Sequence, residues 1–334
     1  MKHTLFKPPL IAATTALILL GSIIPGAAAE ASPLSNTDAF LRSAFTNGQY
    51  VTGFTPGKPD FGFSLEALLQ RKILGEANTT LEPAVKYLLT DAAITGTTAN
   101  QSGYLFSSGK LKLGLAGKWA FVSSILKAKN ALARRQIVSE ALTKIDGSGD
   151  VAADAGANTY DRAWLVLGLA ANDRTKQAAL LATNLANHQL ADGGFNDGFT
   201  LGSSSTDGTG ISLQALSVGR RFGSAAQQKI IGAAIQRADT YLSKTRAGDH
   251  FTSYGDDDVN GTAYAAMGLA SIGTRTSELQ LWLKTKLASD GGIETPWSSG
   301  SGDIYATAQA AAALQGKSYA GLLSNLSLPK AGSR

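Results

Sequence analysis

Two kinds of helical segment alternate along the chain, and they differ in where their polar residues lie. The first kind is rich in Ala and Gly, nearly uncharged and apolar on all sides, as in 159–169, 206–216, 259–269 and 304–314. The second has apolar residues at helical spacing and charges on one face, as in 130–145, 173–190, 225–242 and 277–287. A helix apolar all round is enclosed by protein, whereas one with a polar face borders water. The alternation therefore predicts an inner and an outer ring of helices.

The Ala-rich segments recur at a regular spacing. Two weaker copies lie at 61–69 and 117–126. The leucines that close the six copies are Leu69, Leu126, Leu169, Leu216, Leu269 and Leu314, which lie 43 to 57 residues apart with a mean of 49. A period of this length is typical of a repeat architecture. We therefore predict six two-helix units and no strands, because the segments between helices show no sustained period of two.

Loops of two lengths join the predicted helices. The turn from an inner to an outer helix is short, as at 171–172, whereas the return is long, as at 191–207 and 247–260. All long loops must then gather where the inner helices begin, at the face we call the mouth, and a mouth built of loops is where function is expected. The predicted starts of the inner helices are near Asp60, Gly109, Asn158, Asp207, Asn260 and Asp303.

The N-terminal segment has the layout of a secretory signal peptide. Residues 1–29 carry a short basic start, an apolar run and three alanines, so cleavage is expected after Ala29 or Ala31. The apolar run is shorter than a spanning helix requires, which disfavours an uncleaved membrane anchor. We expect a flexible tether at 30–36, the helical domain at 37–328 and a tail at 329–334. The expected location is secreted or extracytoplasmic, without membrane insertion after cleavage.

Composition removes several classes of function. The 334-residue chain has no cysteine, which excludes disulfides, thiolate metal sites and cysteine nucleophiles. Its formal charge of +5 includes Lys2 and Lys7, so the mature chain is only mildly basic. The basic residues are scattered rather than clustered, and nucleic acid is therefore not an expected partner.

One loop element resembles a known family. Gln189, Asp192, Gly193, Gly194 and Phe195 match the Gln-x-x-Asp-Gly-Gly-aromatic element of the prenyltransferase and squalene-cyclase repeat, and 287–293 is a weaker copy. Over residues 36–327 the resemblance implies an all-α (α/α)6 toroid, as in terpenoid cyclases, prenyltransferase β subunits and the cobalamin carriers of the transcobalamin and intrinsic-factor type. The chain is closest in character to those secreted carriers. Locally, the glycines allow positive φ, Gln189 bonds to backbone and Phe195 fills a gap between units.

The resemblance supports an enzyme only in part. A class II terpenoid cyclase protonates an alkene with an Asp-x-Asp-Asp element, and the nearest match is Asp256-Asp257-Asp258, which has Gly255 at the first position. Protein prenyl transfer would need a zinc-binding cysteine, and Ser-His-Asp hydrolysis would need a Gly-x-Ser-x-Gly element; the chain has neither. A lyase for acidic sugars would need a basic mouth, whereas the long loops are acidic.

The same acids are also half of a calcium-binding pattern. Asp256, Asp258 and Asn260 occupy positions one, three and five of such a loop, but Met267 stands where the bidentate Glu belongs. The alternative is that Asn260, like Asp207 in the aligned unit, caps an inner helix. Calcium is thus one possible cofactor.

Two classes of function follow. The preferred one is a secreted binding protein that holds a corrinoid or an isoprenoid, with a separate lid or transporter protein as a further partner. The alternative is an extracytoplasmic cyclase that uses the unusual acid element, and a cell-surface adhesion or scaffold module is the third possibility.

The expected ligand site is the mouth. Its lining is predicted from aromatic residues of the long loops and first turns, Tyr104, Phe106, Tyr160, Phe199, Tyr254, Trp297 and Tyr305. Its rim is predicted from Asp207, Asp256, Asp257 and Asp303. Because an acidic rim repels a diphosphate, a neutral or amide-bearing ligand is expected.

Overall fold

The computed structural model describes residues 33–94, 102–152, 157–198 and 202–324. The predicted signal segment 1–29 and tail 329–334 lie outside these ranges. The predicted tether at 30–36 is partly wrong, because the first helix already begins at Pro33. None of the helices in the described ranges is long and apolar enough to cross a membrane.

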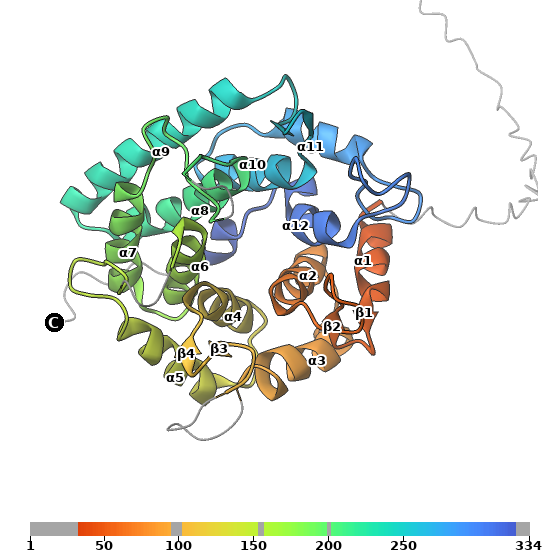
Figure 1. Ribbon diagram of the computed structural model, residues 1–334, viewed down its shortest axis with the longest axis horizontal. Coiled ribbons are helices and arrows are strands. Elements are labelled where there is room, and N and C mark those ends of the chain that lie inside the picture. The colour runs from red at the N-terminus through yellow and green to blue at the C-terminus, as the bar shows by residue number, and fades with distance from the viewer. Residues whose placement is uncertain (1–32, 95–101, 153–156, 199–201, 325–334) are drawn as a thin grey trace, which may run out of the picture. The chain divides into compact units, whose positions relative to one another are not determined.

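Twelve α-helices in the described residues form two concentric rings (Figure 1). The inner helices are α2 (Phe61–Leu74), α4 (Leu113–Ile125), α6 (Thr159–Ala170), α8 (Thr206–Phe222), α10 (Val259–Ser271) and α12 (Ile304–Leu314). The outer helices are α1 (Pro33–Ser43), α3 (Asn78–Lys86), α5 (Ala131–Leu142), α7 (Thr175–Asn187), α9 (Ala225–Thr245) and α11 (Ser277–Thr285). Each inner helix contacts the next, and α12 contacts α2, which closes the ring. The predicted all-α toroid is confirmed, whereas the repeat period stays a prediction.

Glycines in the inner helices let their backbones touch. A Cβ atom added at Gly168 of α6 would lie 2.4 Å from the carbonyl oxygen of Gly117 in α4. A Cβ added at Gly268 of α10 would lie 2.6 Å from the carbonyl oxygen of Gly210 in α8. The Ala and Gly content of these segments therefore reflects close helix packing, since only residues without bulk fit at such contacts.

A recurring hydrogen bond ties the long loops to the inner helices. In four loops a buried residue donates its backbone N–H to a hydroxyl in the first turn of the helix that follows. The pairs are Val51 with Ser64 (2.8 Å), Phe195 with Thr209 (2.9 Å), Phe251 with Thr262 (3.0 Å) and Ile293 with Thr307 (2.8 Å). This bond satisfies a loop N–H that burial would otherwise leave unpaired, so it fixes each loop at the mouth.

The prediction that no strands occur is wrong. Three two-stranded antiparallel hairpins lie in the long loops: β1 (Phe45–Thr46) with β2 (Tyr50–Val51), β3 (Phe106–Ser107) with β4 (Lys110–Leu111), and β5 (Thr252–Ser253) with β6 (Asp256–Asp257). Strands of two residues are too short to show an alternating pattern. Their signal is the turn, because Ser108-Gly109 and Tyr254-Gly255 all have positive φ, as a two-residue hairpin turn requires.

Three of the predicted helix starts are confirmed and three are shifted. Asp60, Asn158 and Asp303 cap α2, α6 and α12 through their side chains. Gly109 lies in a hairpin turn instead, and α4 begins at Leu113.

The remaining two caps lie two residues earlier than expected. Ser205 Oγ accepts the Gly208 N–H at 3.0 Å, and Asp258 Oδ1 accepts the Gly261 N–H at 2.8 Å. Asp207 and Asn260 are therefore not caps, because they lie inside their helices, and their side chains are available for other contacts.

The Gln-Asp-Gly-Gly element forms a clasp. Gln189 Nε2 donates to the carbonyl oxygens of Gly193 at 2.7 Å and Ala234 in α9 at 2.8 Å, and Phe195 is fully buried. Positive φ occurs at Gly193 but not at Gly194, which corrects that part of the expectation. The element thus joins α7, the loop and α9 as a structural device.

The last described segment fills the ring at the end opposite the mouth. Tyr319 is fully buried; its N–H donates to Gln214 Oε1 at 2.7 Å and its hydroxyl accepts from Gln70 Nε2 at 2.9 Å. Arg221, at the C-terminal end of α8, donates to the Leu323 carbonyl oxygen at 2.7 Å, beside the short 3-10 helix η3 (Ala320–Leu323). The centre of the toroid is therefore packed rather than open from end to end.

Candidate functional site

Polar side chains of four inner helices meet below the mouth. Lys118 Nζ of α4 lies 2.9 Å from Glu66 Oε2 of α2, and both side chains are almost completely buried. The Tyr264 hydroxyl of α10 donates to the other oxygen of Glu66, and Tyr160 of α6 lies 2.7 Å from Tyr264, hydroxyl to hydroxyl. We call Glu66, Lys118, Tyr160, Tyr264 and the adjacent Asp207 the mouth cluster.

The ammonium group of Lys118 also contacts aromatic rings. Lys118 Nζ lies 4.7 Å from the ring centre of Trp164 and 6.0 Å from that of Tyr160. Such contacts stabilise an ammonium group by about 2 kcal/mol where it is desolvated. The cluster therefore holds one buried charge pair in a largely aromatic surrounding.

The tyrosines of the cluster remain neutral. Burial raises the pKa of Tyr160 and of Tyr264 well above the ordinary value, and the negative charge of Glu66 raises both further. Both hydroxyls thus keep their protons at physiological pH. Tyr160 is half-buried, and its hydroxyl is linked to Glu66 of the buried pair through the hydroxyl of Tyr264.

Asp207 is the acid of the site. It lies in the first turn of α8, against Gly261 of α10, and its side chain is half-buried. Burial raises the pKa of Asp207 well above its ordinary value, and the negative charges of Asp258, Asp197 and Glu66 raise it further. A helix N-terminus favours an anion by only about 0.3 to 1 kcal/mol. Burial together with three like charges outweighs that, so Asp207 retains its proton at pH values where an ordinary aspartate is ionised.

Two further carboxylic acids at the mouth also have a raised pKa. Burial raises the pKa of Asp258, the cap of α10, and that of Asp161 in the first turn of α6. Each accepts backbone hydrogen bonds that favour the charged form and so limit the shift. Asp207 is the strongest candidate for a proton donor because three like charges add to its burial.

The predicted acid element is dispersed instead of forming one site. Asp257 Oδ2 lies 2.6 Å from Lys286 Nζ, and its Oδ1 lies 3.1 Å from His250 Nε2. The hydrogen bond from Lys286 lowers the pKa of Asp257, so this residue is ionised and a poor proton donor. Asp256 is exposed on the hairpin, and Asp258 caps α10.

The calcium pattern does not converge either. Asp258 accepts the Gly261 N–H, Asn260 donates to Gln309 of α12, and Asp256 lies on the exposed strand β6. Within the described ranges, no three acidic or histidine side chains are grouped as a metal site would require. The geometry therefore gives the calcium prediction no support.

The predicted aromatic residues occupy different environments. Tyr104 is 7% exposed, stacks on Phe61 at 4.0 Å and donates to the Leu88 carbonyl oxygen, so it braces the fold. Tyr305 lies under Phe54, with ring centres 4.7 Å apart.

Other predicted residues lie at the edge of the mouth. Phe106 is half-buried in β3, and Asp303 caps α12. Tyr254 and Trp297 are 93% and 80% exposed. Phe199 lies outside the described residues. Tyr160 and Asp207 are thus the only predicted residues that belong to the mouth cluster, which was defined from described residues.

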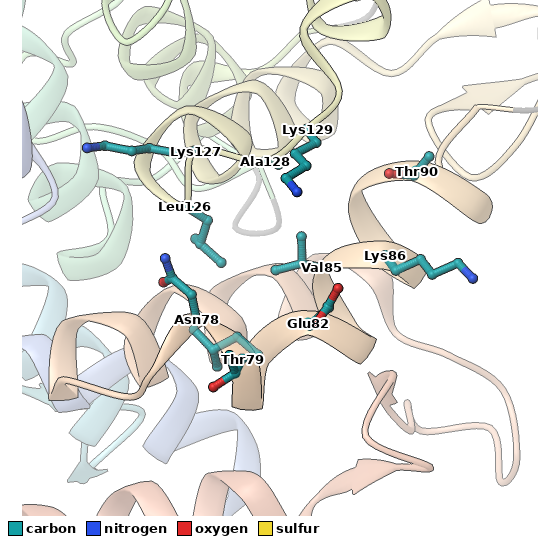
Figure 2. A pocket seen from close by; sticks show the side chains of 11 residues that line it. Asn78, Thr79, Glu82, Val85, Lys86, Thr90, Leu126, Lys127, Ala128 and Lys129 are labelled. Atoms are coloured by element: carbon teal, nitrogen blue, oxygen red, sulfur yellow. The ribbon is translucent and has the colours of Figure 1, made fainter.

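Several surface grooves lie away from the cluster. One, of about 400 Å³, lies between the β5–β6 turn, Lys286 and residues 294–296. Another, of about 350 Å³, lies on the face opposite the mouth, between α3 and the α4–α5 turn. Figure 2 shows Val85 and Leu126 on the walls of this second groove and Lys86 extending away from it. Its lining mixes apolar residues with lysines, neutral polar residues and one acid, Glu82, and contains no group that indicates chemistry.

Glu66, Lys118 and Tyr264 were not predicted as site residues. For Glu66 and Lys118 the signal in the sequence was a single charged residue inside a segment that is otherwise uncharged, 61–69 and 117–126 respectively. Tyr264 carried no such signal. Charges in an enclosed helix must be paired. The pairing of these two charges across α2 and α4 depends on ring geometry, which a single sequence does not reveal.

Several solved structures share the fold. The type II terpene cyclase MstE from Scytonema has a TM-score of 0.63 at 15% identity, covering 84% of this chain and 96% of that chain. Unsaturated glucuronyl hydrolase from Bacillus sp. GL1, responsible for the degradation of glycosaminoglycan, has a TM-score of 0.53 at 12% identity, covering 84% and 94%. No protein-family model and no curated protein matches the sequence. These similarities show the fold, an α/α toroid, and no activity.

Proposed function

We propose that the protein binds an uncharged, unsaturated isoprenoid at the mouth and protonates one of its double bonds through Asp207. The observation that carries the proposal is the half-buried position of Asp207 in the first turn of α8, against Gly261 of α10, where burial and the charges of Asp258, Asp197 and Glu66 raise its pKa. Only a neutral carboxyl group can donate a proton, and a raised pKa keeps the carboxyl protonated at pH values where an ordinary aspartate is ionised. The similarity in fold to a type II terpene cyclase is consistent with this chemistry.

The charges around Asp207 favour an uncharged ligand. Asp258, Asp197 and Glu66 would repel a diphosphate, whereas an alkene brings no charge. An uncharged isoprenoid also agrees with the export expected from residues 1–29, because prenyl diphosphates are made inside cells. A corrinoid, the other expected ligand, would make no use of a neutral acid.

In the proposed step one proton moves from Asp207 to the alkene. The O–H bond of Asp207 breaks while the electron pair of the alkene forms a C–H bond at one carbon, which leaves a cation at the other carbon. Loss of a proton isomerises the alkene, or attack by a second double bond closes a ring before that loss. A solvent proton then returns to the Asp207 carboxylate. The ring of Tyr160, which lies close enough to Asp207 for that charge to raise the pKa of the tyrosine, provides a face that stabilises a cation.

Deuterium incorporation tests the proposal. The full chain is incubated in deuterium oxide with squalene or geranylgeraniol, and with geranylgeranyl diphosphate as the charged comparison. Mass spectrometry should show deuterium bound to carbon in one of the uncharged compounds. Asp207→Asn should abolish incorporation, while Asp173→Asn, at the α6–α7 turn, should leave it unchanged.

Each result of this experiment is decisive for these substrates. Incorporation that survives in Asp207→Asn assigns the proton to another acid and overturns the role of Asp207. Binding of an isoprenoid by the native protein without incorporation favours the binding protein that the sequence first suggested. Incorporation from the diphosphate alone contradicts the argument from charge.

The protonation state can be tested separately through stability. Between the ordinary aspartate pKa of 3.8 and the raised value, the folded state holds a proton at Asp207 that the unfolded state has lost. Stability of the native protein therefore falls as pH rises through this window. We expect Asp207→Asn to equal the native protein near pH 4 and to exceed it near pH 7 by about 1.4 kcal/mol per unit of raised pKa. Urea denaturation between pH 4 and pH 7 measures the difference. If the unfolding free energies of the two proteins ran parallel across this range, the raised pKa of Asp207 would be contradicted.

A further inference from the structure

The centre of the ring is occupied by a side chain that does not belong to the ring helices. Tyr319 lies on the segment that follows α12, here called the plug segment (317–324), and its side chain is fully buried. Its ring centre lies 5.2 Å from that of Trp164 in α6 and 6.3 Å from that of Phe121 in α4. The inner helices therefore build the walls of this central position, while its occupant comes from a separate segment.

The polar walls around Tyr319 are held in place without it. Gln70 Nε2 donates to the Tyr319 hydroxyl at 2.9 Å, and Gln70 Oε1 accepts the Ala312 N–H of α12 at 2.7 Å, which fixes the amide group. The Tyr319 hydroxyl donates to Glu66 at 3.3 Å, and Lys118 holds the same carboxylate at 2.9 Å. Because Ala312 and Lys118 belong to the ring, a donor and an acceptor for one hydroxyl group stay positioned when Tyr319 is absent.

One polar atom beside Tyr319 has no partner. Gln214 of α8 is fully buried, and its Oε1 accepts the Tyr319 N–H at 2.7 Å. The Nε2 atom of the same amide group has no hydrogen-bond partner among the residues that the structure describes. A buried donor without an acceptor destabilises a fold, so Tyr319 alone does not account for this wall. A ligand that carries an amide would pair with both atoms, because an amide both donates and accepts.

Two basic side chains fasten the plug segment to the ring. Arg221 of α8 donates to the carbonyl oxygens of Leu323 at 2.7 Å and Ser324 at 2.8 Å. Lys317 Nζ donates to the Ile73 carbonyl oxygen at 3.1 Å. The toroid is closed by the contact of α12 with α2 and not by this segment. The plug segment can therefore withdraw while the ring stays closed, as a local opening of the structure.

We propose that the ring centre binds a para-hydroxyphenyl compound that carries an amide, and that Tyr319 occupies this site as an internal competitor. The ligand hydroxyl takes the place of the Tyr319 hydroxyl between Gln70 and Glu66. Its ring lies against Trp164, and its amide pairs with both polar atoms of Gln214. Withdrawal of the plug segment opens the site from the end opposite the mouth. The site shares Glu66 with the mouth cluster, but binding involves no proton transfer to carbon, so its test is independent of the proposed function.

Titration calorimetry with the full chain at about pH 7, where a phenol is neutral, measures the binding of three probes. 4-Hydroxyphenylacetamide carries both groups, phenylacetamide lacks the hydroxyl, and p-cresol lacks the amide. We expect 4-hydroxyphenylacetamide to bind about tenfold more tightly than either of the others, since each comparison removes hydrogen bonds to buried partners. Hydrogen exchange followed by mass spectrometry should show faster exchange in 317–324 on binding and no change in α9, because the ligand and Tyr319 exclude each other.

Two arginine variants separate competition from a general effect on stability. Arg221→Gln removes bonds to the plug segment, so more molecules have an open site and 4-hydroxyphenylacetamide should bind about tenfold more tightly. Arg220→Gln is the matched control, because that side chain lies beside Gly232 of α9, and it should leave the affinity unchanged. An affinity in Arg221→Gln no greater than in the native protein would overturn the role of the plug segment.

Gln214→Leu tests the amide contact independently of the plug segment. The variant weakens the hold on the plug segment equally for every probe, so the informative quantity is the ratio of the affinities for 4-hydroxyphenylacetamide and p-cresol. This ratio should fall from about tenfold to about one. An unchanged ratio would overturn the amide contact, and equal binding of phenylacetamide would overturn recognition of the hydroxyl. Binding without faster exchange in 317–324, or no binding to either the native protein or Arg221→Gln, would overturn the proposal.

Discussion

Replacing Lys118 with Met is expected to destabilise the protein by about 3 to 5 kcal/mol at pH 7, because it leaves the buried carboxylate of Glu66 without its cation. Met has a similar length and keeps contact with Trp164, so the loss is of charge more than of packing. The Tyr264 and Tyr319 hydroxyls still donate to Glu66, but these two hydrogen bonds offset only part of the cost of a buried charge. Urea denaturation followed by circular dichroism measures the change.

The double variant Lys118→Met with Glu66→Gln is the control for this prediction. It removes both charges, and replacing a whole buried pair is often close to neutral. We expect it to recover most of the lost stability, with an interaction energy of several kcal/mol in the double-mutant cycle. A single variant within about 1 kcal/mol of the native protein would contradict the buried pair.

The architecture could be predicted because it follows from one-dimensional patterns. Segments that are apolar all round become inner helices, and those with one polar face, such as 225–242, become outer helices; both properties are local. Even the caps Asp60, Asn158 and Asp303 were visible, since a capping side chain acts on a backbone N–H only two or three residues away.

The candidate site could not be predicted in the same way because its contacts cross the ring. Glu66 meets Tyr264 and Tyr319 across 198 and 253 residues of sequence. The raised pKa of Asp207 arises from burial against α10 and from the charges of Asp258, Asp197 and Glu66, none of which is adjacent to it in sequence. The run Asp256-Asp257-Asp258 attracted attention because its acids are consecutive, yet the folded chain gives each a different environment. Consecutive acids are thus a weaker indicator of acid chemistry than one acid placed where several helices converge.

The glycines of the inner ring are expected to be the positions least tolerant of added atoms. Gly168→Ala places a Cβ 2.4 Å from the Gly117 carbonyl oxygen, and backbone cannot rotate away as a side chain can. Alanine gains about 1 kcal/mol of helix propensity over glycine, while overpacking costs about 1 to 3 kcal/mol and more where nothing can yield. The steric cost exceeds the gain in helix propensity here, because α4 and α6 must separate along a contact that closes the ring. We expect Gly168→Ala to lose about 2 kcal/mol and Gly168→Val to abolish cooperative unfolding.

Gly232 in the outer helix α9 provides the matched comparison. A Cβ added there meets only the flexible end of Arg220, at 3.7 Å, which is ordinary contact. The propensity gain is then unopposed, so Gly232→Ala should stabilise the protein by about 0.5 to 1 kcal/mol. Thermal and urea denaturation of the two alanine variants should therefore move in opposite directions from the native protein. A stabilised Gly168→Ala would mean that α4 and α6 are not in backbone contact, and the inner ring would have to be looser than the helix positions described here.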